Sequence, residues 1–144
     1  ESNSKSKQPC HLKLTAAIQR KLLHSIEHCD TSPEAPVVAY VSKVIAVPSQ
    51  YLKNTRNAQN SFIAMTRMFS GTISVGDSLS ILGVRYNPQI PDKHHAIASV
   101  ANLYLLMGPD FVPVEKVYAG DVFGIGGDDF VRHIIKVCII TNDR

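Results

Sequence analysis

The chain lacks the short motifs on which several classes of enzyme depend. It contains no Gly-Lys dipeptide, so the lysine that a P-loop places on the β- and γ-phosphates of a nucleotide is missing. It also contains no Gly-x-Ser-x-Gly elbow and no cysteine with an evident base beside it. We therefore predict that this chain holds no catalytic residue and acts as a binding or scaffolding domain.

Long apolar runs and cysteines are scarce as well. The longest stretch without an acidic or basic residue, His94 to Pro109, contains polar residues and is shorter than the ~20 apolar residues that span a bilayer, so we expect no membrane contact. The first eight residues include neither a methionine nor an apolar segment, which predicts no secretory signal and a start at a fragment boundary. The 3 cysteines show no Cys-x-x-Cys spacing, which favours a reducing compartment and hence a cytoplasmic protein.

Excess charge is also small. The 15 Lys and Arg residues exceed the 12 Asp and Glu residues by a formal charge of only +3, too little for binding nucleic acid by overall charge. Residues 1–30 hold five basic residues against three acidic ones, so more than half of this excess lies there. Any RNA contact made by the remainder must therefore come from particular loops.

Hydrophobic periodicity divides the chain into three parts. Residues 1–14 are polar and without a period, which predicts a disordered tail or the remnant of an insertion. Residues 15–30 predict a short helix, because Ile18, Leu22 and Ile26 recur four apart. Residues 31–144 consist of β-branched and aromatic runs separated by turn residues, which indicates an all-β domain.

We expect a closed antiparallel barrel of six strands in this third part, because several short strands follow one another at close spacing. The expected strands are Val37–Val47, Ser61–Phe69, Asp77–Leu82, Ile97–Met107, Asp121–Gly126 and Ile134–Thr141. In the last of them, Ile135, Val137 and Ile139 are expected on one face and Lys136 on the other. Cys138 is then expected to be a free thiol that is buried or half-buried.

A glycine-rich segment and a histidine pair offer two other kinds of chemistry. Gly124-Ile-Gly126-Gly127 resembles a dinucleotide-binding loop but lacks the third glycine, and acids follow it, so we favour a barrel turn. Asp121-Val-Phe-Gly124 matches the short Asp-x-x-Gly pattern of GTPase magnesium loops, but it falls within an expected strand.

His24 and His28 share a helix face, and Cys29 follows them. Because both histidines are expected on the solvated side of the helix, we favour exposed side chains over a metal site. A zinc-dependent or thiol enzyme that uses these three residues is the alternative.

Basic residues beside aromatic ones give the remaining functional signal. Tyr51, Lys53 and Arg56 lie in one expected loop, and Arg85, Tyr86 and Lys93 lie in another. Cations with aromatic rings suit an RNA backbone and its bases, although the same residues also occur as solvated surface charge. The candidates for RNA or ribosome contact are Lys53, Arg56, Arg67, Arg85 and Lys93.

Two segments resemble a known family. The run from Met68 to Leu79, with Arg67 before it, resembles the Gly-x-Ile-x-x-Gly-x-x-Leu signature of domain II of translational GTPases. The run from Val117 to Gly127 is similar to the Ala-Gly-Asn-x-Val-Gly-Leu-x-Gly segment of the same barrel. The glycines of these family turn motifs are Gly71, Gly76, Gly120, Gly124 and Gly127.

Within that superfamily the chain resembles the elongation factor 2 family over about residues 26–143. Cys29-Asp30, Tyr40-Val-Ser-Lys43 and Ile81-Leu-Gly-Val-Arg-Tyr-Asn-Pro88 follow that family's order. A longer, Asn-rich excursion from Pro48 to Asn60 and the replacement of a glycine by Thr66 are more similar to its ribosome-assembly branch.

The resemblance implies a non-catalytic domain II that packs on a GTPase domain of the same chain. It implies a parent that uses GTP and magnesium to act on the late cytoplasmic 60S subunit with the Shwachman–Diamond syndrome protein, releasing initiation factor 6. The fragment itself is expected to bind no cofactor, and the N-terminal 25 residues are expected to border an insertion. Domain II of elongation factor 2 itself, acting in translocation, and a free-standing RNA-binding barrel remain the alternatives.

Overall fold

The computed structural model describes residues 16–48, 52, 60–87, 89–90, 93–134 and 137–142, and strands predominate in it. This confirms the all-β class. The elements in chain order are α1 (Ala16–Glu27), β1 (Val38–Pro48), β2 (Asn60–Ser70), β3 (Thr72–Ser74), β4 (Ser78–Gly83), β5 (His95–Ser99), β6 (Asn102–Met107), β7 (Asp110–Val114), β8 (Lys116–Tyr118), β9 (Val122–Gly126), α2 (Asp128–Val131) and β10 (Cys138–Thr141).

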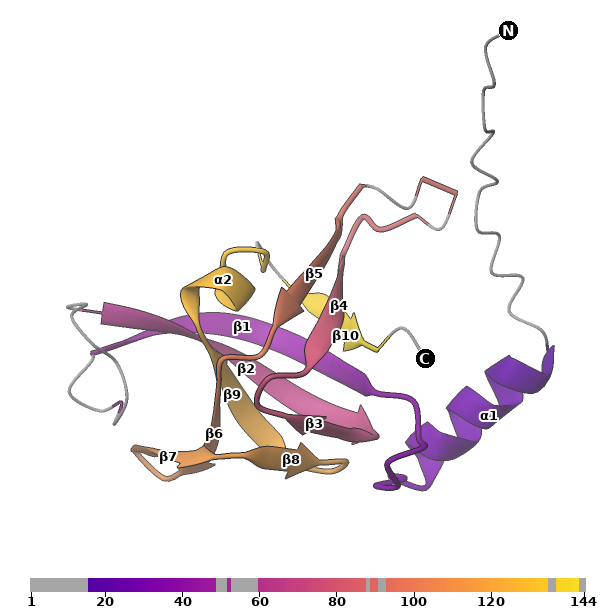
Figure 1. Cartoon of the computed structure of the whole chain (residues 1–144), viewed down its shortest axis with the longest axis horizontal. Coiled ribbons are helices and arrows are strands. Elements are labelled where there is room, and N and C mark those ends of the chain that lie inside the picture. The colour runs from indigo at the N-terminus through magenta and orange to yellow at the C-terminus, as the bar shows by residue number, and fades with distance from the viewer. Residues whose placement is uncertain are drawn as a thin grey trace, which may run out of the picture.

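Eight of the strands form one antiparallel sheet in the order β5-β4-β10-β1-β2-β9-β6-β7, and β3 pairs with β8 in a second sheet (Figure 1). Strands β5 and β7 are the two edges of the larger sheet, so among the described residues hydrogen bonding does not close it. The expectation of a closed barrel of six strands is therefore not confirmed: the structure has ten strands, and the larger sheet is open.

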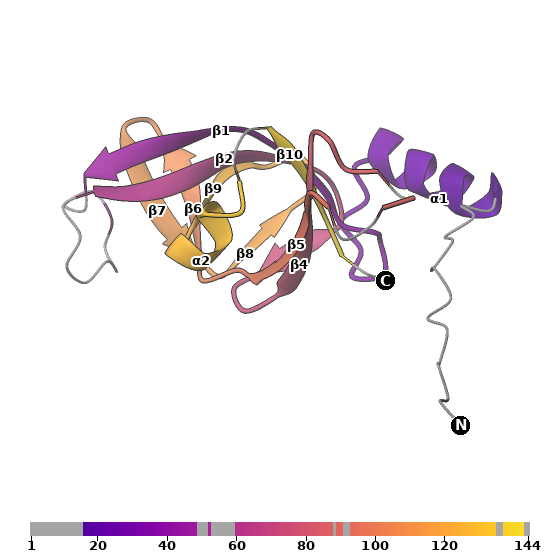
Figure 2. The ribbon, with the colours of Figure 1, turned by 90° about the horizontal axis from the view of Figure 1, so that it is seen from above.

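The larger sheet is strongly curled, and α2 lies on its concave side (Figure 2). Curling lets both arms of the sheet contribute to one core, because antiparallel strands twist and β1 carries irregularities at Val38/Ala39 and Val41/Lys43 that increase the bend. The cluster joins Ala39 of β1, Leu79 of β4 and Phe123 of β9. Phe130 of α2 is fully buried in the same cluster, so the helix fills the space that the curled sheet leaves.

A smaller apolar cluster lies at the far end of the β1–β2 hairpin. It contains Val47, Leu52, Ile63 and Tyr104. The ring of Tyr104 meets Phe111 edge-on, with 6.4 Å between the centroids. Because burial disfavours the phenolate, the pKa of Tyr104 is raised.

Several strand boundaries differ from the expectation. The range Ile97–Met107 contains two strands, β5 and β6, because the backbone of Val100 bonds with the turn at Gly76 and Asp77 instead of continuing a ladder. The short strands β3, β7 and β8 were not expected at all.

The last strand buries the face opposite to Ile139. Ile139 is 48% exposed, whereas Cys138 and Ile140 point into the core. Apolar residues stand at consecutive positions here, so their alternation could not identify the buried face. Ile135 and Lys136 lie outside the described residues.

Helix α1 extends from the sheet and meets it through its C-terminal end (Figure 1). Beyond the helix, the Asp30 carbonyl accepts a 2.8 Å hydrogen bond from the Gly71 N–H. The Asp30 carboxylate accepts a bond from the Ser32 N–H, which lowers its pKa. The apolar face of α1 is only partly covered, since Ile18 stays 49% exposed.

Candidate nucleic-acid interface

The candidate basic residues fall into two separate places. Arg85 and Lys93 are exposed in the hairpin that joins β4 and β5. Arg67 is exposed on β2, where its guanidinium lies 5.6 Å from the centroid of the Phe69 ring. Lys53 and Arg56, with their neighbour Tyr51, lie outside the described residues.

Arg67 does not share a site with the hairpin. It faces Tyr40 of β1, which faces Ile139 of β10, which faces Leu82 of β4. Three strand spacings of about 4.8 Å place Arg67 roughly 14 Å from the β4 position across the sheet. The structure therefore brings Arg85 and Lys93 to one hairpin and leaves Arg67 apart from them.

A hollow of ≈ 520 Å³ lies between the β4–β5 hairpin and the segment around α2 and β10. Five of its lining residues carry guanidinium or imidazole groups, namely Arg85, His94, His95, Arg132 and His133. The others are apolar or small, namely Ile81, Gly83, Val84, Ala96, Val137 and Cys138. Of these, Ile81 and Cys138 are buried and form its floor. None of the described lining residues is acidic, so the hollow offers donors and cations without a competing carboxylate in its wall.

The hairpin holds its histidines in a defined backbone arrangement. The Gly83 N–H donates a 2.8 Å hydrogen bond to the His94 carbonyl, and His94 adopts a left-handed φ of 60°. The Tyr86 ring lies 6.0 Å from the His95 ring at a tilt of 59°. Both histidines are thus tied to the strands and placed beside an aromatic ring.

The remaining basic residues of this hollow stand in no recognisable sequence motif. His94 and His95 are adjacent in a polar loop segment, and no functional motif includes them, Arg132 or His133. Arg132 forms an exposed ion pair with Asp129. The Arg132-His133 dipeptide, two residues beyond the acid pair at 128–129, is the available signal, but only the packing of α2 inside the sheet brings it to the hairpin.

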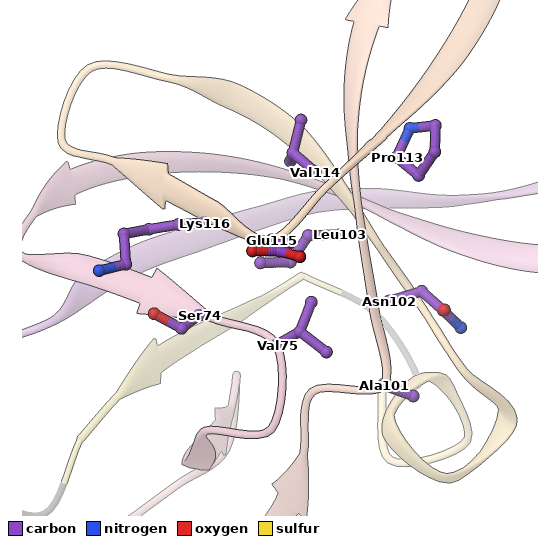
Figure 3. A pocket seen from close by; sticks show the side chains of 9 residues that line it. All are labelled: Ser74, Val75, Ala101, Asn102, Leu103, Pro113, Val114, Glu115 and Lys116. Carbon is purple, nitrogen blue, oxygen red and sulfur yellow. The ribbon is translucent and has the colours of Figure 1, made fainter.

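A larger hollow of ≈ 710 Å³ contains none of the candidate residues (Figure 3). It lies between the end of β3, the start of β6 and the β7–β8 connection, and Figure 3 shows Val75 and Glu115 directed into it. Its two charged groups, Glu115 and Lys116, have opposite signs. This balance does not favour a polyanion.

Most glycines of the family motifs occupy turns. Gly71, Gly76 and Gly120 have φ values of 83°, 92° and 95°, and Gly127 has 125°. At Gly71 a Cβ would lie 3.0 Å from the Pro36 carbonyl oxygen, so both the left-handed backbone and the close approach require glycine.

Gly124 is an exception among the motif glycines, because it lies inside β9 and not in a turn. A Cβ there would come within 2.5 Å of the Ile63 side chain, and one at Gly126 would lie 2.8 Å from the Tyr104 ring. These glycines let β9 pack closely between β2 and β6. Asp121 accepts a 2.9 Å hydrogen bond from the Tyr118 N–H and so stabilises a turn.

The histidine pair of α1 is solvent-exposed. The rings of His24 and His28 stack with centroids 4.1 Å apart, and His28 Nδ1 donates to the His24 carbonyl. Cys29 is exposed beside them. Within the described ranges, no three His, Cys, Asp or Glu residues form a group that could hold a metal ion.

Cys138 is the other free cysteine of the described part of the chain, and it is 4% exposed. Burial raises the pKa of its thiol to about 11, so the thiol stays protonated and unreactive at neutral pH. No described helix has the length and apolar character needed to cross a membrane.

Similarity to known proteins connects this fold with one family. No family model matches the chain. It is 31% identical to ribosome assembly protein 1 of Schizosaccharomyces pombe, over 72% of this chain and 15% of that protein. It is 37% identical to elongation factor-like GTPase 1 of Homo sapiens, over 60% of this chain and 9% of that protein. With elongation factor 2 of Encephalitozoon cuniculi it shares 34% identity, over 85% of this chain and 13% of that protein.

The chain therefore spans 15% or less of the length of these three relatives. Among solved structures, translation elongation factor SelB of Methanococcus maripaludis overlaps 78% of the chain at 16% identity and a TM-score of 0.49, a level that carries no further argument. The sequence similarity to three translation-factor relatives, over most of the chain, agrees with the resemblance in the glycine motifs. This chain is a translation-factor domain of the elongation factor 2 family.

Proposed function

We propose that this chain is the non-catalytic β domain, domain II, of a translational-type GTPase that acts in late maturation of the 60S subunit in the cytoplasm. In this proposal the parent binds GTP and magnesium through a GTPase domain elsewhere in the protein. Its partners are the large ribosomal subunit and the Shwachman–Diamond syndrome protein, and its action releases initiation factor 6. The observation that carries the proposal is the 31% identity to ribosome assembly protein 1 over 72% of the chain.

The domain would work by mechanical coupling. Both arms of the curled sheet contribute to one core, which favours movement of the domain as a rigid body. The nucleotide state of the neighbouring GTPase domain would bias the orientation of this rigid body, and exposed loops would pass the change to the ribosome. The basic β4–β5 hairpin is the described loop whose chemistry best suits such contact.

Elongation factor 2 is the second candidate, because the match to its Encephalitozoon cuniculi member extends over 85% of this chain. A segment exchange separates the two. The matching segment of Schizosaccharomyces pombe ribosome assembly protein 1 is replaced by this chain, and free 60S subunits are measured by polysome profiling after the resident gene is shut off. A parallel exchange places the chain in elongation factor 2.

We expect the first chimera to restore 60S levels and the second to fail in translation. The segment of elongation factor 2 placed in ribosome assembly protein 1 is the matched control and should not restore them. Rescue of elongation factor 2 alone would overturn the assembly role. The non-catalytic role is checked by titrating the purified chain with a fluorescent GTP analogue, where micromolar affinity would contradict it.

A further inference from the structure

We propose that the hollow between the β4–β5 hairpin and the segment around α2 binds a single-stranded RNA segment, with guanidinium and imidazole groups on its phosphates and the ring of Tyr86, beside the lining residue His95, against a base. This inference rests on the proposed ribosomal function and specifies how one surface of the domain would contact RNA. The hollow joins two segments far apart in the sequence, represented by Arg85 and Arg132, around an apolar floor.

Donors of the right type surround the space. Arg85 and Arg132 supply guanidinium groups, which form bidentate hydrogen bonds with phosphate oxygens. His94, His95 and His133 add imidazole N–H donors, which bond to phosphate even when the ring is neutral. Such a set can hold two neighbouring phosphates of one strand.

The apolar part of the hollow favours RNA over a simple inorganic anion. Val84 and Val137 line it beside the basic groups, and Val84 is 72% exposed. The rings of Tyr86 and His95 lie 6.0 Å apart at its edge. Unstacked bases pack on aromatic and imidazole planes, and they are accessible in single-stranded RNA but not in a duplex.

Counted with Lys93 of the same hairpin, Arg85 and Arg132 exceed the described acids nearby, Asp128 and Asp129, by one positive charge. Asp129 pairs with Arg132, and its side chain is 81% exposed. Asp128 is exposed at the start of α2. Neither carboxylate lines the hollow, so the phosphate-binding face of Arg85 is unopposed there. The chain as a whole carries only +3, so binding would depend on this place and not on overall charge.

The test measures fluorescence anisotropy of a labelled ten-nucleotide oligouridylate titrated with the purified chain at two KCl concentrations. The double variant Arg85→Ala/His133→Ala removes one guanidinium and one imidazole from the hollow, and both residues are exposed, so the fold is retained. The matched control Arg20→Ala/His24→Ala removes the same kinds of group from exposed positions of α1, outside the hollow. A loss of about tenfold in affinity is expected for the hollow variant, the size of one lost base or phosphate contact.

The control variant should stay within about twofold of the unmodified chain, because such surface charges act only at long range. Contact with two phosphates predicts a slope of about −1.4 for log affinity against log salt. Equal losses in the two variants, or no loss in the hollow variant, would overturn the site. Equal competition by polyglutamate, or by inorganic phosphate at matched charge, would overturn the assignment to RNA.

The segment exchange separates this inference from the proposed function. If the chimera restores 60S levels but the chain binds no oligouridylate, only the RNA site fails. If the chain binds RNA at the hollow but neither chimera restores growth, the proposed function fails and the site stands.

Discussion

At the scale of single residues, the close packing of β9 decides how the middle of the sheet is built. Gly124 and Gly126 stand where side chains of β2 and β6 occupy the space of a Cβ. The family motif predicts that Gly124 is a turn glycine, because its spacing in the sequence matches that motif. The structure explains its presence by the volume of Ile63 instead, a reason that no local pattern contains.

We expect Gly124→Ala to destabilise the fold by roughly 1–3 kcal/mol, because the new methyl group overlaps Ile63 and the core must shift. Combining it with Ile63→Ala should recover part of that loss, so the double variant costs less than the two single variants together. Urea denaturation followed by circular dichroism measures all three free energies of unfolding.

Gly108 provides the control for this coupling. Its φ is 64° and no heavy atom lies within 4 Å of a Cβ built there, so Gly108→Ala costs only backbone strain. Its effect should add to that of Ile63→Ala without coupling. If the effect of Gly124→Ala also simply adds to that of Ile63→Ala, then the Ile63 side chain is not the reason that position 124 requires glycine.

At the scale of elements, α1 and the sheet differ in how much each contributes to stability. The helix meets the sheet through its C-terminal end, and Leu23 on it is 57% exposed. Met68 on β2 is 1% exposed and belongs to the main core. Helix amphipathicity was visible in the sequence, but the structure leaves Ile18 largely uncovered.

Truncation of these two side chains should therefore have unequal effects. Leu23→Ala is expected to change the free energy of unfolding by less than about 0.5 kcal/mol, since it is a surface position with good helix propensity in both forms. Met68→Ala is expected to cost about 2–5 kcal/mol, through lost contacts and a cavity. Thermal and urea unfolding of the two variants gives the comparison, and a large loss from Leu23→Ala would mean that α1 packs on something further.

For the molecule as a whole, each of the two apolar clusters contains one buried ionisable group, a thiol or a phenol, whose protonated form is favoured by burial. Burial raises the pKa of Cys138, in the main cluster, from 9.0 to about 11, and it also raises the pKa of Tyr104 in the smaller cluster. The folded chain thus holds these protons at a pH where the unfolded chain has released them. The contribution of these two groups to stability is complete at pH values below their pKa in the unfolded chain. It is lost as the pH rises through their higher pKa in the folded chain.

Stability should accordingly fall between pH 9 and pH 11, by roughly 2–3 kcal/mol for Cys138 alone at 1.36 kcal/mol per unit of pKa difference. Urea midpoints across this range measure the decline. Cys138→Ala should show a shallower decline than the unmodified chain. An equal slope in the two proteins would assign the effect to Tyr104 or to exposed groups.

The sequence alone determined the all-β class, the position of α1 and the membership of the elongation factor 2 family. The all-β class and the helix follow from local periodicity, and the family follows from the resemblance of short motifs to known ones, so each is visible within a few neighbouring residues. The sequence did not reveal all ten strands of the described residues, because β3 and β8 have only three residues each and β7 contains Pro113, which is atypical of a strand. The sequence also left open which face of the last strand is buried, because apolar residues occupy consecutive positions there. The structure exposes Ile139 and buries Cys138 and Ile140.

Only the tertiary structure decided which basic residues belong together. Arg67 was a candidate on equal terms with Arg85, yet the strand order puts β1 and β10 between them. Conversely, α2 packs inside the curled sheet and brings Arg132 and His133 to the hairpin that carries Arg85. Curling of a sheet is set by contacts between distant segments, and sequence spacing does not encode such contacts.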